Sequence, residues 1–400
     1  SGNSITVDGM HLPCRAVFEI RTRAGGAVVL PCFLTGRIVG SYAQVFGGIA
    51  YIRPAPQMYH PPVHGVPGQR TLQNLLRTAL MPVGIALYVY GGGSSVTRGV
   101  EPTKGGISLD MRRNFNKVIK FNETDQTITV QAGMSGPKLE ETLQNAQSLF
   151  GAKRPYTCGH FPQSFEYSSV GGWAVTRGAG QNSSYYGKIE DIVISQEYVT
   201  PIGIIKSDEF PRNATGPSID QIMMGSEGTF GILTHVTLRV FKYMPENRKK
   251  FSYVFKDWEN GLNAAREIMQ GEFGFPSVFR LSDPEETSIA FRLYGVADTV
   301  IDGKRVLMLG WSEGEKHFSK NVAKQIDKIC KKHGAMYTTS IVTKGWEKGR
   351  FTDPYLREDM GDYGLMLDTL ECSVNWDNFT NVYENVRRFC KSRPDTICMT

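Results

Sequence analysis

The chain has 400 residues, enough for two or three domains at roughly 150 residues each. Hydrophobic residues make up 40% and charged residues 21%, which is ordinary for a globular protein. The formal charge of +6 suits attraction to phosphates or carboxylates, but it is too small to argue for a nucleic-acid-binding protein. The longest apolar run, at 27–34, is far below the roughly 18 residues of a membrane-spanning helix.

Residues 1–66 carry no chemistry that we can assign. Short apolar runs at 27–30 and 44–52 alternate with Gly and Pro. His60 and His64 are four residues apart, as in some metal sites, but the prolines between them forbid the helix that would align them. We therefore expect no metal here and leave this segment unassigned.

From residue 67 the pattern predicts alternating strands and helices. Ile85–Val89 is typical of a short buried strand, and it ends in the glycine-rich stretch Gly91–Ser95. Residues 118–121 and 127–130 alternate around a turn and predict a hairpin. Ser135 is a candidate helix cap, and the apolar stripe after it predicts one helix reaching Leu149.

The stretch Pro162–Ala179 surrounds Gly171 and Gly172 with hydroxyl side chains and one cation, Arg177. Glycine lets the backbone approach a ligand closely, and successive N–H groups in turns form anion sites. The alternative is an ordinary Ser/Gly loop, since loops share this composition. After it, Ile189–Ile194 predicts a strand, and Gly225–Gly231 is a third glycine-rich loop.

The composition changes to a charged linker at 241–250, where we place a domain boundary. Beyond it, helices are predicted at Trp258–Met269, Glu315–Lys332 and 377–391, and a strand at 306–309. This order predicts a second α+β domain.

Three loops rich in Gly, Ser and Thr suggest one large phosphate-bearing ligand that is held mainly by backbone. The usual fingerprints fail: Val96 stands where the last glycine of G-x-G-x-x-G belongs, and no G-x-x-x-x-G-K-[ST] occurs. No HExxH, CxxC or G-x-S-x-G motif occurs either. A pyrophosphate that bridges two such loops is the best physical interpretation.

These stretches resemble the FAD-binding domain of the vanillyl-alcohol oxidase type and, within that superfamily, the alkyldihydroxyacetonephosphate synthase family. The matching segments are YGGGSS (90–95), GHFPQSFEYSSVGGWAVTRGAG (159–180), YGKIEDIV (186–193) and GSEGTFGILT (225–234). The synthases' substrate domain is similar to SVFRLSD (277–283), WEKGRFTDPYLREDMGDYG (346–364) and DTLECSVNWDN (368–378). The resemblance covers roughly 70–400 and leaves 1–66 without a match.

The resemblance implies an α+β fold with a two-part FAD-binding domain at 67–240 and an α+β substrate (cap) domain at 241–400. It implies non-covalent FAD, because the Gly91–Ser95 loop lacks the His or Cys that attaches FAD covalently elsewhere in the superfamily. The family's proton-transferring tyrosine and histidine-rich segment would follow the last residue of this sequence. We therefore expect a substrate domain that is truncated at its C-terminus.

The resemblance also assigns cofactor residues. Val89–Ser95 would hold the pyrophosphate, Gln163–Ser169 would line the flavin and its diphosphate, and Thr176–Ala179 would continue that cradle. Glu227–Leu233 would run alongside the adenosine and ribityl parts of FAD. Gln163 departs from the acidic residue that is usual in the family. The matching positions are Val89, Tyr90, Gly91, Gly92, Gly93, Ser94, Ser95, Gln163, Ser164, Phe165, Glu166, Tyr167, Ser168, Ser169, Thr176, Arg177, Gly178, Ala179, Glu227, Gly228, Thr229, Phe230, Gly231, Ile232 and Leu233.

Three residues are candidates for catalysis: Arg280, Arg357 and His160. The arginines match family arginines near the flavin, and guanidinium groups bind phosphate or carboxylate at two points. Each could instead be a surface or ion-paired arginine. A neutral His160 could hydrogen-bond the flavin or satisfy a turn.

The implied reaction exchanges the acyl chain of an acyl-dihydroxyacetone phosphate for a fatty alcohol, through a covalent adduct at flavin N5 and without net redox change. One alternative is an FAD-linked 2-hydroxyacid dehydrogenase or oxidase, and another is a catalytically incomplete flavin-binding protein. The resemblance further implies a lipid or hydroxyacid substrate, a homodimer and peripheral contact with a membrane. It implies a peroxisomal protein in a eukaryote and a cytoplasmic one in a bacterium.

Overall fold

The computed structural model describes the backbone of six strands between residues 4 and 53, then Gln69, Leu72, Gln73 and Leu76, and residues 84–400 apart from 96, 104, 294–301, 353–354 and 356–358. The described residues form two compact units. The first comprises 1–179 and 187–241, and the second comprises 180–186 and 242–400. Across these residues, no helix combines the length and apolar content needed to span a membrane.

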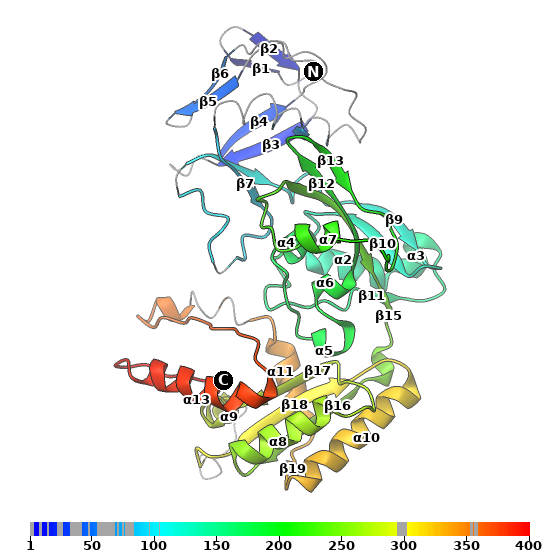
Figure 1. The fold of residues 1–400 in the computed structure, drawn as a ribbon, viewed down its shortest axis with the longest axis vertical. Helices are drawn as coiled ribbons and strands as arrows, with labels where there is room; N and C mark the ends of the chain where they lie inside the picture. The colour runs from blue at the N-terminus through cyan, green and yellow to red at the C-terminus, as the bar shows by residue number, and fades with distance from the viewer. Residues whose placement is uncertain are drawn as a thin grey trace. The chain divides into compact units, whose positions relative to one another are not determined.

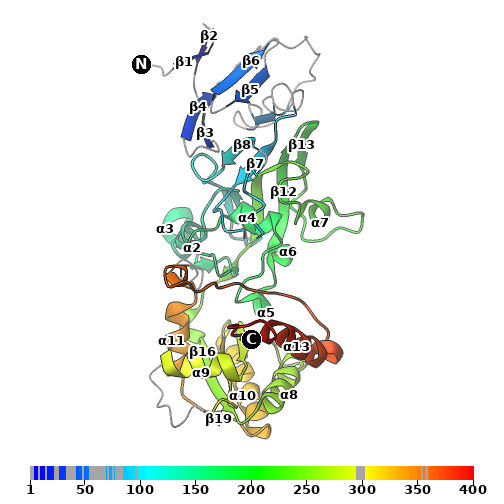
Figure 2. The ribbon, with the colours of Figure 1, turned by 90° about the vertical axis from the view of Figure 1, so that its left-hand side faces the viewer.

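The first unit contains one larger sheet and several two-stranded pairings, four of which precede that sheet in the chain. Three of the pairings are antiparallel: β1 (Ser4–Val7) with β2 (Met10–Pro13), β3 (Ala16–Arg21) with β4 (Ala27–Cys32), and β5 (Tyr42–Phe46) with β6 (Ile49–Arg53). The fourth is parallel, between β7 (Leu87–Tyr90) and β8 (Ile107–Asp110). Figure 1 labels β7, and Figure 2 labels both strands. The first glycine-rich loop leaves the end of β7, as predicted.

The larger sheet has five antiparallel strands in the order β13-β12-β14-β10-β9. They are β9 (Val118–Asn122), β10 (Thr127–Gln131), β12 (Val193–Thr200), β13 (Gly203–Lys206) and β14 (Ile232–Arg239). The predicted hairpin is confirmed as β9 and β10. Ile128, Val130, Val199 and Val236 are fully buried, so this sheet carries much of the unit's core. A short pair, β11 (Tyr156–Thr157) with β15 (Phe241–Lys242), completes the strands of this unit.

The helices of the first unit correct three predictions. They are α2 (Gly136–Gln144), α3 (Ala146–Phe150), α4 (Val170–Val175), α6 (Ile189–Ile192) and α7 (Ile219–Met223). The single helix predicted after Ser135 breaks at Asn145 into α2 and α3. The stretch Pro162–Ala179 is not all loop, because α4 lies inside it.

The strand predicted at Ile189–Ile194 is wrong over its first four residues, which form α6. The side chain of Asp191 accepts a hydrogen bond from the backbone N–H of Lys188 at 3.0 Å, and this contact caps the helix start. Glu190 and Asp191 also place negative charge in the first turn, where the helix dipole favours it. The strand β12 therefore begins only at Val193.

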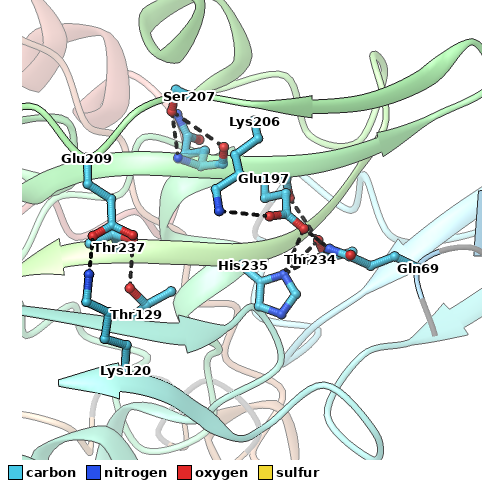
Figure 3. Close-up of polar contacts among 11 residues, drawn as sticks. Gln69, Lys120, Thr129, Glu197, Lys206, Ser207, Glu209, Thr234, His235 and Thr237 are labelled. Atoms are coloured by element: carbon cyan, nitrogen blue, oxygen red, sulfur yellow. Dashed lines mark hydrogen bonds and ion pairs between the residues drawn. The ribbon is translucent and has the colours of Figure 1, made fainter. Parts of the chain in front are cut away.

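A polar network on the five-stranded sheet links three strands and residue 69 (Figure 3). Nδ1 of His235 lies 3.3 Å from a carboxylate oxygen of Glu197, and Nζ of Lys206 lies 3.7 Å from the other. The hydrogen bond from His235, aided by the charge of Lys206, holds the pKa of Glu197 below its usual range. Gln69 donates to the hydroxyl of Thr234 at 2.9 Å, so the chain before β7 is fastened to this sheet.

The second unit is a four-stranded antiparallel sheet with helices on both faces. Its strand order is β17 (Val278–Ser282), β18 (Val306–Ser312), β16 (Lys249–Phe255) and β19 (Met336–Tyr337). The helices are α5 (Ser183–Tyr186), α8 (Trp258–Met269), α9 (Pro284–Leu293), α10 (Lys316–Lys332), α11 (Ile341–Gly349) and α13 (Trp376–Lys391), with a 3-10 turn at Pro245–Asn247 (Figure 2). The predicted helices at 258–269, 315–332 and 377–391 are confirmed within a residue.

Alternation along β16 explains the two layers. Phe251, Tyr253 and Phe255 point to the face that α8 and α10 cover, where Ile268 and Ile326 complete a buried cluster. Val254 points to the other face and packs with residues of α9, α11 and β18. A strand with both faces buried has a nearly continuous apolar sequence, as β18 does from Val306 to Leu309.

Candidate cofactor site

The first two glycine-rich stretches touch through their backbones. A Cβ placed on Gly92 would lie 2.2 Å from the carbonyl oxygen of Tyr167 and 2.6 Å from Cα of Ser168. A Cβ on Gly91 would lie 2.3 Å from Oγ of Ser169. Such separations are too short for any side chain, so glycine at 91 and 92 is what allows these loops to meet.

The third glycine-rich loop lies against the same pair. A Cβ on Gly228 would be 3.4 Å from the side chain of Val89, the residue two before the first loop. The backbone N–H of Glu227 donates to the carbonyl oxygen of Val175 at 3.0 Å. The three loops therefore lie together in the first unit, although 130 or more residues separate Gly92 from the last of them.

Helix α4 and the turn before it, which together we call the floor of the site, pack beside the three loops. Oγ of Ser169 accepts a hydrogen bond from the N–H of Gly172 at 3.3 Å and so starts α4. The ring of Trp173 stacks on Phe165 with centroids 6.2 Å apart, and both side chains are buried. The central loop is thus anchored by aromatic packing rather than being free.

The residues present suit a phosphate-bearing dinucleotide held by backbone. In the described part of the chain, no backbone carbonyl accepts from the N–H groups of Gly91, Gly92 or Gly93. Gly93 has φ +70°, which glycine adopts at little cost. Consecutive free N–H groups beside serine hydroxyls form a concave site for an anion such as a pyrophosphate.

His160 lies in the core beside this floor. It is fully buried, its ring centroid is 4.9 Å from that of Trp173, and neither ring nitrogen has a hydrogen-bond partner among the described residues. Burial lowers the pKa of His160 to about 3. The imidazole is therefore neutral at physiological pH, and its assignment to catalysis stays a prediction.

The predicted cofactor residues divide into three groups by exposure. Exposed are Gly93, Gln163, Glu166, Thr176, Ala179, Glu227, Thr229 and Phe230. Half-buried are Val89, Tyr90, Gly91, Gly92, Ser94, Ser95, Ser164, Tyr167, Arg177, Gly178 and Gly228. Buried are Phe165, Ser168, Ser169, Gly231, Ile232 and Leu233. Ile232 and Leu233 pair with Val199 and Tyr198 in the sheet, which limits what they can offer a ligand.

The two candidate arginines belong to the second unit. Arg280 lies on β17 and forms an ion pair with Glu286 of α9. Arg357 lies outside the described residues. Their predicted role in binding substrate therefore stays a prediction.

Sequence reasoning missed several partners of this site. It gave no role to Trp173, whose indole contacts the buried Ser168, or to Gln221, which contacts Arg177. It offered Met224 as an apolar wall or core residue and missed that its carbonyl oxygen accepts from Arg177. No sequence signal identifies these residues, because each contact depends on how separate segments fold together.

Comparison with known proteins identifies the family. The model of the FAD-binding domain matches residues 69–208, and that of the C-terminal domain of FAD-linked oxidases matches 244–400. The chain has the two-part FAD-binding fold of the vanillyl-alcohol oxidase type. Its cofactor is therefore FAD.

Within this superfamily, the resemblance to alkyldihydroxyacetonephosphate synthases is confirmed. The chain is 31% identical to the synthase of Caenorhabditis elegans over 337 residues, which cover 76% of the chain and 53% of that relative. A solved structure of an alkyldihydroxyacetonephosphate synthase matches with a TM-score of 0.69 and 26% identity, over 83% of this chain and 61% of that one.

A second kind of relative is also similar. An uncharacterised FAD-linked oxidoreductase of Escherichia coli (strain K12) is 32% identical over 303 residues, covering 72% of the chain and 59% of that protein. The chain spans about half the length of the synthases that it matches.

Proposed function

We propose that this member of the superfamily is an FAD-dependent transferase of the alkyldihydroxyacetonephosphate synthase type. It would replace the acyl chain of an acyl-dihydroxyacetone phosphate with a fatty alcohol. The observation that carries the proposal is that the similarity to the synthases covers 76% of the chain and includes the second unit as well as the FAD-binding domain. The second unit is where a substrate domain is expected.

When bound, FAD would supply an electron sink for this chemistry. The three loops of the first unit would hold its phosphates through backbone N–H groups, without covalent attachment. Arg280 and Arg357 would bind the substrate phosphate, because a guanidinium offers two parallel donors to such a group. Because both substrates carry lipid chains, the proposal includes peripheral contact with a membrane. It also includes assembly into a homodimer.

The similarity to a mitochondrial D-lactate dehydrogenase of Saccharomyces cerevisiae, 32% identical over 154 residues, favours a second candidate, an FAD-linked oxidation of a 2-hydroxyacid. Here the same arginines would bind a carboxylate, and hydride would pass from the substrate carbon to FAD. The two reactions differ in net redox change, and this difference separates them experimentally.

The deciding experiment uses the full chain reconstituted with FAD. Incubation with an acyl-dihydroxyacetone phosphate and a radiolabelled fatty alcohol should transfer label into an alkyl-dihydroxyacetone phosphate and release one fatty acid per alcohol incorporated. Anaerobic addition of D-lactate or D-2-hydroxyglutarate should leave the flavin absorbance unchanged. If either hydroxyacid bleached the flavin and no label were transferred, the second candidate would be established. If neither reaction occurred, the chain would bind flavin without catalysis.

Arg280 provides a second test. Arg280→Lys keeps the charge but loses the two-point geometry. We expect it to weaken binding of the acyl-dihydroxyacetone phosphate by about tenfold, or 1.4 kcal/mol, and to leave FAD content unchanged. If Arg280→Lys weakened the binding of the fatty alcohol as much as that of the acyl-dihydroxyacetone phosphate, a phosphate-binding role of Arg280 would be contradicted.

A further inference from the structure

Arg177 occupies a backbone position that normally belongs to glycine. It follows the C-cap of α4 and has φ +51°, in the left-handed backbone region that residues other than glycine rarely adopt. Its N–H donates to the carbonyl oxygen of Ala174 at 3.2 Å, and the N–H of Gly178 donates to that of Trp173 at 2.9 Å. These two bonds define a Schellman motif, in which glycine is the favoured residue at this position. An arginine here is explained only if its side chain contributes something that glycine cannot.

The side chain of Arg177 reaches the end of α7, 44 residues further along the chain. Nε donates to the carbonyl oxygen of Met224 at 3.1 Å, and Nη2 donates to the carbonyl oxygen of Gln221 at 2.7 Å and to its Oε1 at 2.9 Å. The last carbonyls of a helix have no partner within it, and a cation also suits the negative end of its dipole. Arg177 therefore closes the C-terminus of α7.

The third glycine-rich loop begins where α7 ends. The N–H of Gly225 donates to the carbonyl oxygen of Ala174 at 3.2 Å, and that of Glu227 donates to Val175 at 3.0 Å. A Cβ on Gly225 would lie 3.1 Å from Cδ of Arg177, so the loop runs directly against the stem of the arginine. Figure 1 shows α4 and α7 together in the first unit. Three side-chain bonds thus join Arg177 to the end of α7, and two backbone bonds join α4 to the loop that follows.

We propose that Arg177 is a positioning residue for FAD: it fixes the loop at 225–231 in its binding geometry and does not bind the cofactor through its charge. Two of its donor nitrogens, Nε and Nη2, are already used by α7. A loop that is held in place before binding adds no ordering cost when FAD arrives. The inference rests on FAD binding alone, so it is independent of whether the enzyme transfers an alkyl group or oxidises a hydroxyacid.

Two variants separate the side chain from the backbone turn. Arg177→Gly removes the guanidinium and relieves the left-handed backbone, whereas Arg177→Met removes the guanidinium and keeps that strain. Arg98→Gly is the matched control, because Arg98 also has a positive φ (+59°) but has a side chain that is 68% exposed. All four proteins are prepared without FAD, and hydrogen exchange of residues 219–231, melting temperature and the Kd for FAD are measured.

We expect both Arg177 variants to exchange amide hydrogens at 219–231 at least tenfold faster than the wild type and Arg98→Gly. The Kd for FAD should rise by at least tenfold in both, because the binding-competent loop is populated less often. Arg177→Gly should melt at a higher temperature than Arg177→Met.

Unchanged exchange at 219–231, or an unchanged Kd, would overturn the proposal. The dependence of Kd on salt gives a further criterion. If Arg177 bound a phosphate of FAD directly, the wild type would lose affinity with added salt and Arg177→Gly would lose much less. Equal salt dependence in the two proteins is the result that supports a positioning role.

Discussion

The indole Nε1 of Trp173 donates a hydrogen bond to Oγ of Ser168 at 2.7 Å, and both side chains are buried. This bond fixes the central loop to α4 next to Gly92. Ser168→Ala leaves the indole N–H buried without an acceptor, which should lower the free energy of unfolding by about 1–3 kcal/mol. Urea denaturation of the protein without FAD measures this change.

The control is a double-mutant cycle with Trp173→Phe. Once the indole N–H is absent, Ser168→Ala should cost much less than it does in the wild type. Strictly additive losses would show that the hydrogen bond contributes nothing to stability.

Gly92→Ala should force the first two loops apart. Its methyl group would meet the backbone at Tyr167 and Ser168, which cannot move away as a flexible side chain could. We expect destabilisation by about 1–3 kcal/mol and a loss of FAD from the purified protein. The absorbance of bound flavin per protein checks the second outcome.

Gly203→Ala is the matched substitution, because no atom lies within 4 Å of a Cβ at Gly203. It should change stability by less than about 0.5 kcal/mol and keep the flavin. If both alanine variants bound FAD like the wild type, close packing of the loops would not be a requirement for binding.

His160 should make the protein sensitive to acid. The folded state keeps this imidazole neutral down to a pKa of about 3, whereas the unfolded chain takes up a proton below about 6.5. Because the unfolded state binds more protons between these values, the free energy of unfolding should fall as pH falls, by up to about 1.4 kcal/mol per pH unit from this residue. Urea denaturation at several pH values between 7 and 5 measures the slope.

His160→Gln should flatten that slope, and His317→Gln, which removes an exposed imidazole of α10, should leave it unchanged. A slope that stays the same in His160→Gln would mean that other groups dominate the acid response.

The second unit contains a largely buried ion pair between Arg248 and Glu313; Arg248 also pairs with Glu347. The side chains of Arg248 and Glu313 are 2.9 Å apart and only 21% and 7% exposed. Arg248→Met leaves the Glu313 carboxylate in the interior without its cation, so we expect a loss of about 3–5 kcal/mol in the free energy of unfolding. Guanidinium denaturation followed by tryptophan fluorescence suits this measurement, because the guanidinium of Arg248 lies over the ring of Trp311 at 5.0 Å.

Lys331→Met tests the specificity of that effect. Lys331 forms an exposed pair with Asp327 at 2.7 Å, and such pairs contribute less than about 1 kcal/mol. Comparable losses in the two variants would contradict the importance of burial.

The sequence alone determined those features that depend on neighbouring residues. The apolar periodicity of 258–269 and 315–332 predicted α8 and α10 within a residue, because one face of each helix packs on the sheet. The glycine-rich stretches predicted a phosphate-bearing ligand held by backbone, since glycine lets a backbone approach a ligand closely. The resemblance of the longer motifs around them predicted the family and FAD.

Only the tertiary structure decided which segments meet and what their side chains do there. Residues 189–192 have the apolar content of a strand, but they form α6, which packs against α4 and β12. Arg177 was predicted to contact FAD, whereas the fold gives Nε and Nη2 of its guanidinium to the end of α7, 44 residues away. The reason is physical: local patterns record the preference of one element for a helix, a strand or a turn, but the partner of a donor is set by the packing of distant elements.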